Sequence, residues 1–491
     1  MADLDEAIEL HRDALLLRPP DLLVAKSWAA FADTLNHASA LLAYKTALRF
    51  LDQQVALLSP SFHHFDVIKE AVSSLATDAF SCSVRQHALT TVVELVEQGR
   101  AVFWTQLARF STPLDELSVS GDTGAALAEE FKRSSFRIRN AFDQSTEDRS
   151  SQIRQLTMQW DDVVSRIRML PDFSRFLLPP LFSDLQKAVL SSLSMLTEVV
   201  DLSSEFQSLT KEFGSFDTKL QLVSILRKIW HKVVGPVVQA LRVSNVRPNS
   251  RIWWCPTAEF ALLPLHAAGA YEKKRDSLSH IYISSYTPTL ATLVRARRQV
   301  SRDASPQHFV AIAPEIAVLT KRLAPVVSSF TRLEDSDATV EGAFDALNRN
   351  QWLHMACHGM PNRRQPFESS FAMRDGLLMI KDIIRSNWQD PQFAFLSACH
   401  TTVGDEKSPD ESIHLAAAMQ FSGFRSVIGS MWSVDDEVAQ EAASGFYENL
   451  IDISGRLDCT RAAMPLHKAL KKLRRSGIPL EQQIVFVHIG V

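Results

Sequence analysis

Cysteine is scarce and scattered in this sequence. Its five cysteines are spread over 491 residues, and no two of them form a CxxC pair. A disulfide framework or a zinc site of the usual spacing is therefore not expected, and a reducing compartment is the simplest environment for the chain. We expect neither a metal nor an organic cofactor.

The sequence also lacks an excess of basic charge and long apolar runs. Its formal net charge is -4, which argues against nucleic acid or an anionic membrane as the main partner. No stretch reaches the roughly 18 apolar residues that a membrane helix needs, and the first residues are acidic where a signal peptide would be basic. We expect a cytoplasmic protein, with the nucleus left open.

Glycine is rare up to about residue 245, and apolar residues recur there at intervals of three and four. This pattern predicts stacked amphipathic helices over 1–245. Residues 4–21, LDEAIELHRDALLLRPPD, place apolar residues on one side of a helix that stops at Pro19-Pro20. They resemble the second helix of a tetratricopeptide repeat, as do residues 43–60. Without a clean 34-residue period, we interpret the region as degenerate repeats that bind a protein partner.

From residue 246 to 491 the pattern changes to short apolar runs that alternate with helical segments. Such runs are typical of strands buried on both faces of a largely parallel α/β sheet. The predicted strands are 251–255, 281–286, 308–313, 352–357, 393–399 and 426–432, and predicted helices include 411–421 and 436–450. In such sheets reacting groups gather at the carboxyl ends of the strands.

Two of these runs end in polar residues. HMACHG (354–359) ends in His358 and Gly359, and LSACHT (396–401) contains Cys399. If the strands are parallel neighbours, the imidazole can activate the thiol, and the Gly359 N–H can approach an oxyanion. Alternatively both motifs are core, since free cysteine is often buried. His354 and Cys357 we assign to packing.

The second half closely resembles the CHAT domain, a caspase- and separase-related cysteine peptidase module often found after tetratricopeptide repeats, especially in fungal and bacterial proteins. The matching stretches are RIWWCPTAEFALLPLHAAG (251–269), YISSYTPTLATLVRAR (282–297), HMACHG, FLSACHTTVGDE (395–406), ESIHLAAAMQFSGFRSVIGSMWSVDD (411–436) and FVHIGV (486–491). The resemblance implies a caspase-like fold of mostly parallel sheet flanked by helices and a fungal-type protein. It implies His358 as general base, Cys399 as nucleophile, and the backbone N–H groups of Gly359 and Cys399 as the oxyanion hole.

The stretch GSMWSVDD carries a further implied residue. Asp436 resembles a family acid that faces a basic side chain before the scissile bond, with Asp435 as its substitute; a carboxylate there selects arginine or lysine. The alternative is that these aspartates only begin the helix 436–450. His266 and His488 we assign to packing.

These observations predict a cysteine endopeptidase that cleaves a protein substrate after Arg or Lys through a Cys399–His358 dyad. One alternative is a catalytically inactive adaptor that binds partners through its helical region. Another is a redox-sensing domain in which Cys399 acts without a base. Relative to the family it resembles, the chain lacks an apolar strand near 189–202 and has a short connection at 313–328, which predicts a reduced sheet.

Overall fold

The chain divides into two compact units, Met1–Ala188 and Val189–Val491. The computed structural model describes residues 21–57, 74–100, 102, 105, 109–110, 112, 114–141, 150–178, 196–213, 218–273, 276–298, 306–312, 317–360, 362, 368–385, 388, 390–397, 415–452 and 454–491. The predicted helix at the N-terminus lies outside these residues. Among the described helices, none combines the length and the apolarity that crossing a bilayer requires.

The described part of the first unit is helical, which confirms the prediction for this region. Its main helices are α2 (Leu22–Thr34), α3 (Ala40–Leu57), α5 (Leu75–Arg85), α6 (Leu89–Gly99), α8 (Asp115–Ser118), α9 (Asp122–Ala141) and α10 (Ser150–Arg168). Helices close in sequence pack as pairs, α2 on α3, α5 on α6 and α9 on α10. A polar contact ties two pairs together, because Asp33 of α2 accepts hydrogen bonds from Tyr44 of α3 at 3.1 Å and from Arg85 of α5 at 2.6 Å.

The first described elements of the second unit are helices rather than strands. These are α12 (Leu196–Thr210), α13 (Thr218–Ile229) and α14 (Gly235–Val243), with a π-helical turn at Trp230–Val234 between the last two. A new helix begins at Gly235 with proline in its first turn, where the missing N–H of proline costs no helical hydrogen bond. The Phe206 ring of α12 packs edge-on against Trp432 at 5.8 Å, within the core of the second unit. The change from helices to strands thus falls near residue 245, whereas the two compact units divide earlier, between Ala188 and Val189.

An eight-stranded sheet forms the centre of the second unit in the part of the chain that the structure describes. Its order is β1-β2-β11-β10-β9-β5-β3-β4. The strands are β1 (Arg251–Trp254), β2 (Ile283–Tyr286), β3 (His308–Ile312), β4 (Ser329–Leu333), β5 (Trp352–Met355), β9 (Phe393–Leu396), β10 (Ser426–Ser430) and β11 (Phe486–Gly490). All neighbouring pairs are parallel except β10 and β11. The prediction of a mostly parallel α/β sheet is therefore confirmed.

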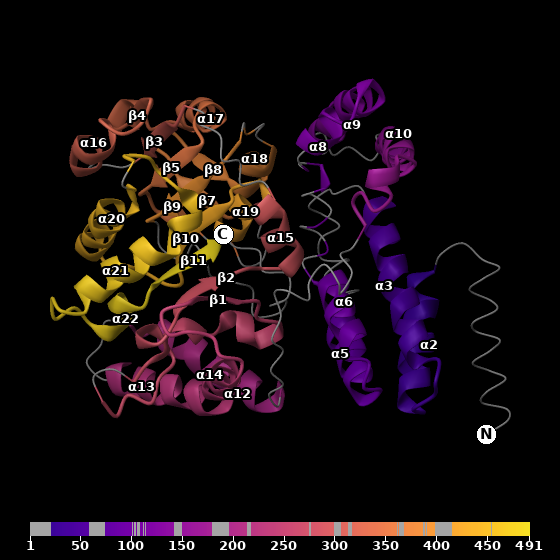
Figure 1. The fold of residues 1–491 in the computed structure, drawn as a ribbon, viewed down its shortest axis with the longest axis horizontal. Coiled ribbons are helices and arrows are strands. Elements are labelled where there is room, and N and C mark those ends of the chain that lie inside the picture. The colour runs from indigo at the N-terminus through magenta and orange to yellow at the C-terminus, as the bar shows by residue number, and fades with distance from the viewer. Residues whose placement is uncertain are drawn as a thin grey trace. The chain divides into compact units, whose positions relative to one another are not determined.

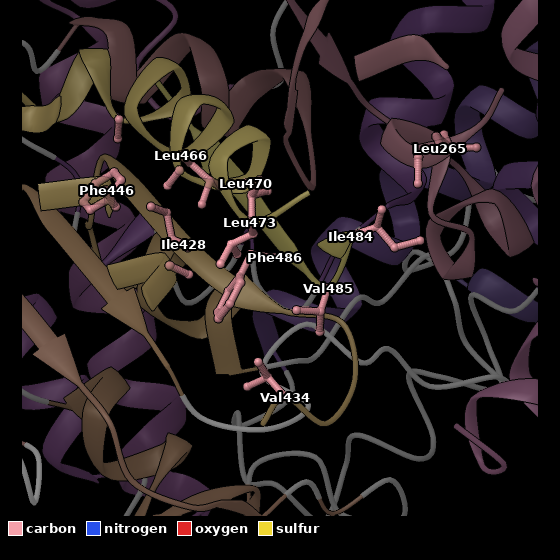
Figure 2. Close-up of a cluster of buried hydrophobic side chains, with 14 of the residues drawn as sticks. Leu265, Ile428, Val434, Phe446, Leu466, Leu470, Leu473, Ile484, Val485 and Phe486 are labelled. Carbon is pink, nitrogen blue, oxygen red and sulfur yellow. The ribbon is translucent and has the colours of Figure 1, made fainter. Parts of the chain in front are cut away.

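Helices cover both faces of this sheet (Figure 1). Helices α16 (Ala317–Leu323), α20 (Asp436–Leu450) and α21 (Ala463–Leu473) lie on one face, and α15 (Leu290–Arg298), α18 (Ile380–Arg385) and α19 (Leu415–Phe421) lie on the other. Helix α17 (Val340–Arg349) packs on β3 and β4, and the short α22 (Leu480–Gln483) precedes β11. Figure 2 shows the core between sheet and helices: Ile428 and Phe486 from the strands meet Phe446 of α20 and Leu466, Leu470 and Leu473 of α21.

Three strands form a smaller antiparallel sheet beside the main one. They are β6 (Gly359–Met360), β7 (Ser370–Ala372) and β8 (Leu377–Met379), in the order β6-β7-β8. Neither this sheet nor β4 was among the predicted strands. The sequence predicted a reduced sheet from two connections, 189–202 and 313–328. Residues 189–195 and 313–316 of these connections lie outside the described residues, and α12 and α16 follow them.

Candidate active site

Three neighbouring strands end at one edge of the main sheet. β5, β9 and β10 are parallel, with Met355 opposite Leu396 and Phe395 opposite Ile428. The carboxyl ends of parallel strands lie at the same edge, so the residues that follow these strands gather there. His358 follows β5, and the aspartates 435 and 436 follow β10.

His358 is exposed at this edge, between the main sheet and the small one. Its backbone carbonyl accepts a hydrogen bond from the N–H of Ala372 on β7 at 2.9 Å. The next residue, Gly359, is the antiparallel register partner of Phe371. In an antiparallel ladder, bonded and non-bonded pairs alternate. Because the His358–Ala372 pair is bonded, the Gly359 pair is not, and the Gly359 N–H points away from β7.

The other two reactive side chains of HMACHG belong to packing, as predicted. His354 is buried on β5, where its Nδ1 lies 3.2 Å from the Tyr447 hydroxyl of α20 and its ring 5.2 Å from the Phe395 ring. Burial lowers the pKa of His354 to about 3, so the imidazole is neutral. Burial also raises the pKa of the Cys357 thiol to about 12, which keeps it protonated and a poor nucleophile.

The loop between β10 and α20 presents two exposed aspartates. Asp435 is the N-cap residue of α20 and Asp436 its first residue, yet the Asp435 side chain makes no capping hydrogen bond. Hydrogen bonds to residues of α22 hold the backbone of this loop. Gln482 accepts a hydrogen bond from the Asp435 N–H at 3.1 Å and donates one to the Ser433 carbonyl at 3.3 Å. Trp432 donates its Nε1–H to the Glu481 carbonyl at 3.1 Å. The backbone of the loop is thus fixed while its carboxylates face solvent.

His266 and His488 pack in the interior, which confirms their assignment. His266 contacts the Tyr286 hydroxyl at 2.9 Å and the Ile484 carbonyl at 2.9 Å, and burial lowers its pKa to about 4. His488 on β11 contacts Ser426 on β10 at 2.7 Å, and burial followed by the charge of Arg251 holds its pKa well below the usual value. Both imidazoles are neutral structural groups that join strands and loops.

Cys399 lies outside the described residues, so the structure gives no distance between its sulfur and His358. Strand β9 ends at Leu396, and the backbone N–H of the next residue, Ser397, donates to the Met355 carbonyl at 2.9 Å. The Ser397 hydroxyl is buried and has no hydrogen-bond partner among the described residues. Among the described residues, no group of three or more His, Cys, Asp or Glu side chains is arranged to hold a metal ion.

Two parts of this site escaped the sequence interpretation. Gln482 fixes the β10–α20 loop from a short helix forty-six residues beyond Asp436, and only the fold brings them together. The β7 strand, which orients His358 and Gly359, is three residues long and is preceded by polar residues. A buried strand of that length carries no periodic signal strong enough to be recognised.

Comparison with known proteins gives one family. Residues 223–479, just over half of the chain, match the profile of the CHAT domain. No curated protein matches the sequence.

Two solved cysteine peptidase structures are similar. Gingipain R, the Arg-specific cysteine proteinase of Porphyromonas gingivalis, is 10% identical with a TM-score of 0.37, and the alignment covers 60% of this chain and 74% of that chain. The Saccharomyces cerevisiae separase–securin complex is 10% identical with a TM-score of 0.42, and the alignment covers 92% of this chain and 37% of that chain. Both similarities are remote, and nothing about activity follows from them.

Proposed function

The chain belongs to the CHAT domain family, and from this premise we propose that it is a cysteine endopeptidase in which Cys399 is the nucleophile and His358 its general base and acid. The protein substrate would be cut after arginine or lysine. No metal or organic cofactor takes part in this chemistry.

The register between β5 and β9 carries the proposal. Met355 and Leu396 are partners in the parallel ladder, and each precedes a reactive residue by the same three positions, His358 on one strand and Cys399 on the other. When two neighbouring parallel strands end at paired residues, the segments that follow them begin side by side. This matched spacing supports a hydrogen-bonded pair of thiol and imidazole, the arrangement that activates a cysteine nucleophile.

The reaction assigns each group one task. His358 takes the thiol proton, the thiolate of Cys399 attacks the scissile carbonyl carbon, and the C–N bond breaks as His358 returns the proton to the leaving amine. Water then hydrolyses the thioester with His358 again as base. The Gly359 N–H, which is directed away from β7, is free of that ladder to donate to the oxyanion. The backbone N–H of Cys399 would be the second donor.

Asp436 and Asp435 are proposed to select the residue before the scissile bond. They follow β10, whose carboxyl end lies beside that of β9. Their carboxylates are exposed, and the fixed backbone of their loop would hold them ready for a guanidinium or ammonium group. Asp436 is our first choice and Asp435 the substitute.

The helical first unit is proposed to be a degenerate tetratricopeptide-repeat region that recruits the substrate or a regulatory protein. Its paired helices, α2 with α3 and α5 with α6, are compatible with such repeats. A cytoplasmic or nuclear location would suit five scattered cysteines without a CxxC pair.

The test compares wild type with Cys399→Ala and His358→Ala on a library of arginyl and lysyl peptides, with the whole chain in every case. Wild type should cleave, Cys399→Ala should not, and His358→Ala should cleave far more slowly than wild type. The matched control is Cys357→Ala, which changes the neighbouring cysteine whose thiol is protonated and should retain cleavage.

Two outcomes would contradict the proposal. Equal cleavage by wild type and Cys399→Ala would assign the activity to another residue or to a contaminant. No cleavage by any variant, together with no reaction of Cys399 with an electrophilic peptide probe, would favour the adaptor alternative, in which the helical unit binds partners and the second unit is catalytically inert.

A further inference from the structure

The turn between β7 and β8 rests on the N-terminus of helix α17. Arg374 of this turn donates its backbone N–H to the Ala338 carbonyl at 3.0 Å, and the Asp375 carboxylate accepts a hydrogen bond from the Val340 N–H at 2.8 Å. A Cβ added at Gly376 would lie 3.5 Å from the Val340 side chain, which is ordinary packing distance. Strand β8 lies beside α17 (Figure 1). The small sheet is therefore joined to α17 through this turn.

Asp375 satisfies a backbone group that α17 leaves open. The first N–H groups of a helix have no partner within the helix. The N-cap residue of α17, Thr339, accepts a hydrogen bond from the Gly342 N–H at 3.0 Å. The Val340 N–H, at the first helical position, donates instead to Asp375, which belongs to a different element. A carboxylate at this place also suits the positive end of the helix dipole.

The strand that precedes this turn sets the backbone of His358. Ala372, the last residue of β7, donates its N–H to the His358 carbonyl at 2.9 Å. Asp375 follows Ala372 by three positions, and within the turn the Met373 N–H donates to the Gly376 carbonyl at 2.9 Å. A displacement of the turn would therefore move β7 and, with it, the carbonyl of His358.

The two ends of the segment that contains His358 meet at this contact. From Val340 the chain runs through α17 and β5 to His358, and from there through β6 and β7 to Asp375. Strand β5 fixes His358 from one side, because it lies inside the main sheet between β9 and β3. The hydrogen bond between Asp375 and Val340 fixes it from the other side. Asp375 itself is exposed, so its replacement should leave the buried cores intact.

We propose that Asp375 is a positioning residue for the proposed dyad. By accepting the Val340 N–H it fixes the β7–β8 turn and, through β7, the place of His358 relative to Cys399. Asp375 touches no reacting atom in this role. The inference rests on the proposed function, because it requires that His358 is the partner of Cys399.

Alkylation of Cys399 in the full chain tests this role, with peptide mapping by mass spectrometry. A thiol that is paired with His358 should react at pH 6. Asp375→Ala should lower this rate by about 2- to 30-fold, the factor that corresponds to the loss of one capping hydrogen bond. The rate at about pH 9, where an ordinary thiol is largely ionised, should stay unchanged.

Two further variants at the same end of α17 serve as controls. Asp375→Asn keeps an oxygen that can accept the Val340 N–H, so it should retain most of the wild-type rate at pH 6. Glu341→Ala removes an exposed carboxylate from the first turn of α17 but leaves the contact in place, and should equal wild type. A loss that is equal for Asp375→Ala and Glu341→Ala would assign the effect to charge near the helix and would overturn the proposal.

Val340→Pro tests the same hydrogen bond from its donor. Proline is tolerated at the first helical position, and the residue before it, Thr339, already has the extended backbone that a following proline requires. Val340→Pro should lower the rate at pH 6 as Asp375→Ala does, and the double variant should lower it no further. Val340→Ala, which keeps the N–H, is the control and should react as wild type. Multiplicative losses in the double variant would contradict the proposal.

Hydrogen exchange of the Ala372 amide tests the contact without reference to the dyad. This amide donates to the His358 carbonyl, so Asp375→Ala and Val340→Pro should each speed its exchange by about 2- to 30-fold. Asp375→Asn and Glu341→Ala should leave its exchange close to that of wild type. Unchanged exchange in Asp375→Ala would overturn the proposal.

The alkylation profiles also separate this inference from the proposed function. A wild-type profile in Asp375→Ala, beside a changed profile in His358→Ala, would overturn the positioning role and leave the dyad in place. An equal loss at both pH values in Asp375→Ala would give the residue a purely structural role and would likewise overturn the inference. Identical profiles in wild type and His358→Ala would overturn the dyad and, with it, the role of Asp375.

Discussion

His354 and Phe395 are register partners on β5 and β9, and their rings lie 5.2 Å apart on the face of the sheet that α20 covers. Side chains alternate between the two faces of a strand. Four positions further along each chain stand His358 and Cys399. The packing of the two core rings therefore helps to fix the register of the two strands from which His358 and Cys399 follow.

Removal of both members of the proposed dyad should cost no more than removal of one. His358→Ala should lower kcat/KM by about 100- to 10,000-fold, the usual contribution of a positioned general base. Cys399→Ala should lower it further, and the double variant should equal Cys399→Ala, because the two groups act as a unit. Steady-state kinetics on one arginyl peptide measures all three. Independent, multiplicative losses would separate His358 from the nucleophile.

Asp436→Asn should weaken cleavage after basic residues. A hydrogen bond to a charged group contributes about 1.5–3 kcal/mol, so kcat/KM for arginyl peptides should fall by about 10- to 100-fold. Reaction of Cys399 with a small alkylating reagent should be unchanged. Glu437→Gln serves as control, because Glu437 is exposed one residue further along α20. If Asp436→Asn and Asp435→Asn both keep the wild-type preference for arginine, neither aspartate lines the pocket.

Tyr447→Phe should destabilise the second unit. The variant keeps the ring but removes the hydroxyl that lies 3.2 Å from the buried His354 Nδ1. A buried polar atom left without its partner costs about 1–3 kcal/mol in the free energy of unfolding. Urea denaturation measures the loss. In a His354→Leu background the same change should cost little, and an equal cost in both backgrounds would show that the contact contributes nothing.

Acid should destabilise the protein through its buried histidines. Burial, and then the nearby charges of Arg474 and Lys471, lower the pKa of His467 to about 4, against about 6.5 in the unfolded chain. Between these values the unfolded state binds the proton and the folded state does not, so stability rises with pH across this window and is lost as pH falls through it.

His467→Gln tests this pH dependence with a side chain that is only half-buried. The slope of the unfolding free energy against pH should decrease in the variant between about pH 4 and 6.5. The decrease should be at most about 1.4 kcal/mol per pH unit, the value for one proton. Urea denaturation at pH 5 and pH 7 measures it. An unchanged slope would show that His467 titrates normally in the folded state.

The strands that sequence could predict are those with continuous apolar runs. β3, β5, β9 and β10 have buried residues at nearly every position, because both faces of the sheet are covered there. β4, the sequence SFTRL, escaped prediction because it is an edge strand with exposed and polar residues. The register of β5 against β9 could not be predicted either, because it follows from packing between distant segments.

The parts of the candidate site that directly follow a continuous apolar run could be predicted from the sequence. The positions of His358 and of the aspartates at strand ends follow from the apolar pattern. The hydrogen bond between Gln482 and the Asp435 N–H could not be predicted, because a glutamine near the C-terminus gives no signal of its partner. The assignment of α12 to the second unit also needed the structure, because its amphipathic pattern does not tell which surface it covers, whereas its Phe206 ring packs against Trp432.

The pH dependence of Cys399 alkylation tests the dyad most directly. Burial raises the pKa of the Cys82, Cys357 and Cys459 thiols to about 11, 12 and 12, so they should stay unreactive near neutral pH. Peptide mapping by mass spectrometry separates the reaction of Cys399 from that of Cys255. With His358 as its partner, Cys399 should react at pH 6 nearly as fast as at pH 8, and His358→Ala should shift the profile toward the ordinary thiol pKa of about 8.5. Identical profiles in wild type and His358→Ala would contradict the dyad.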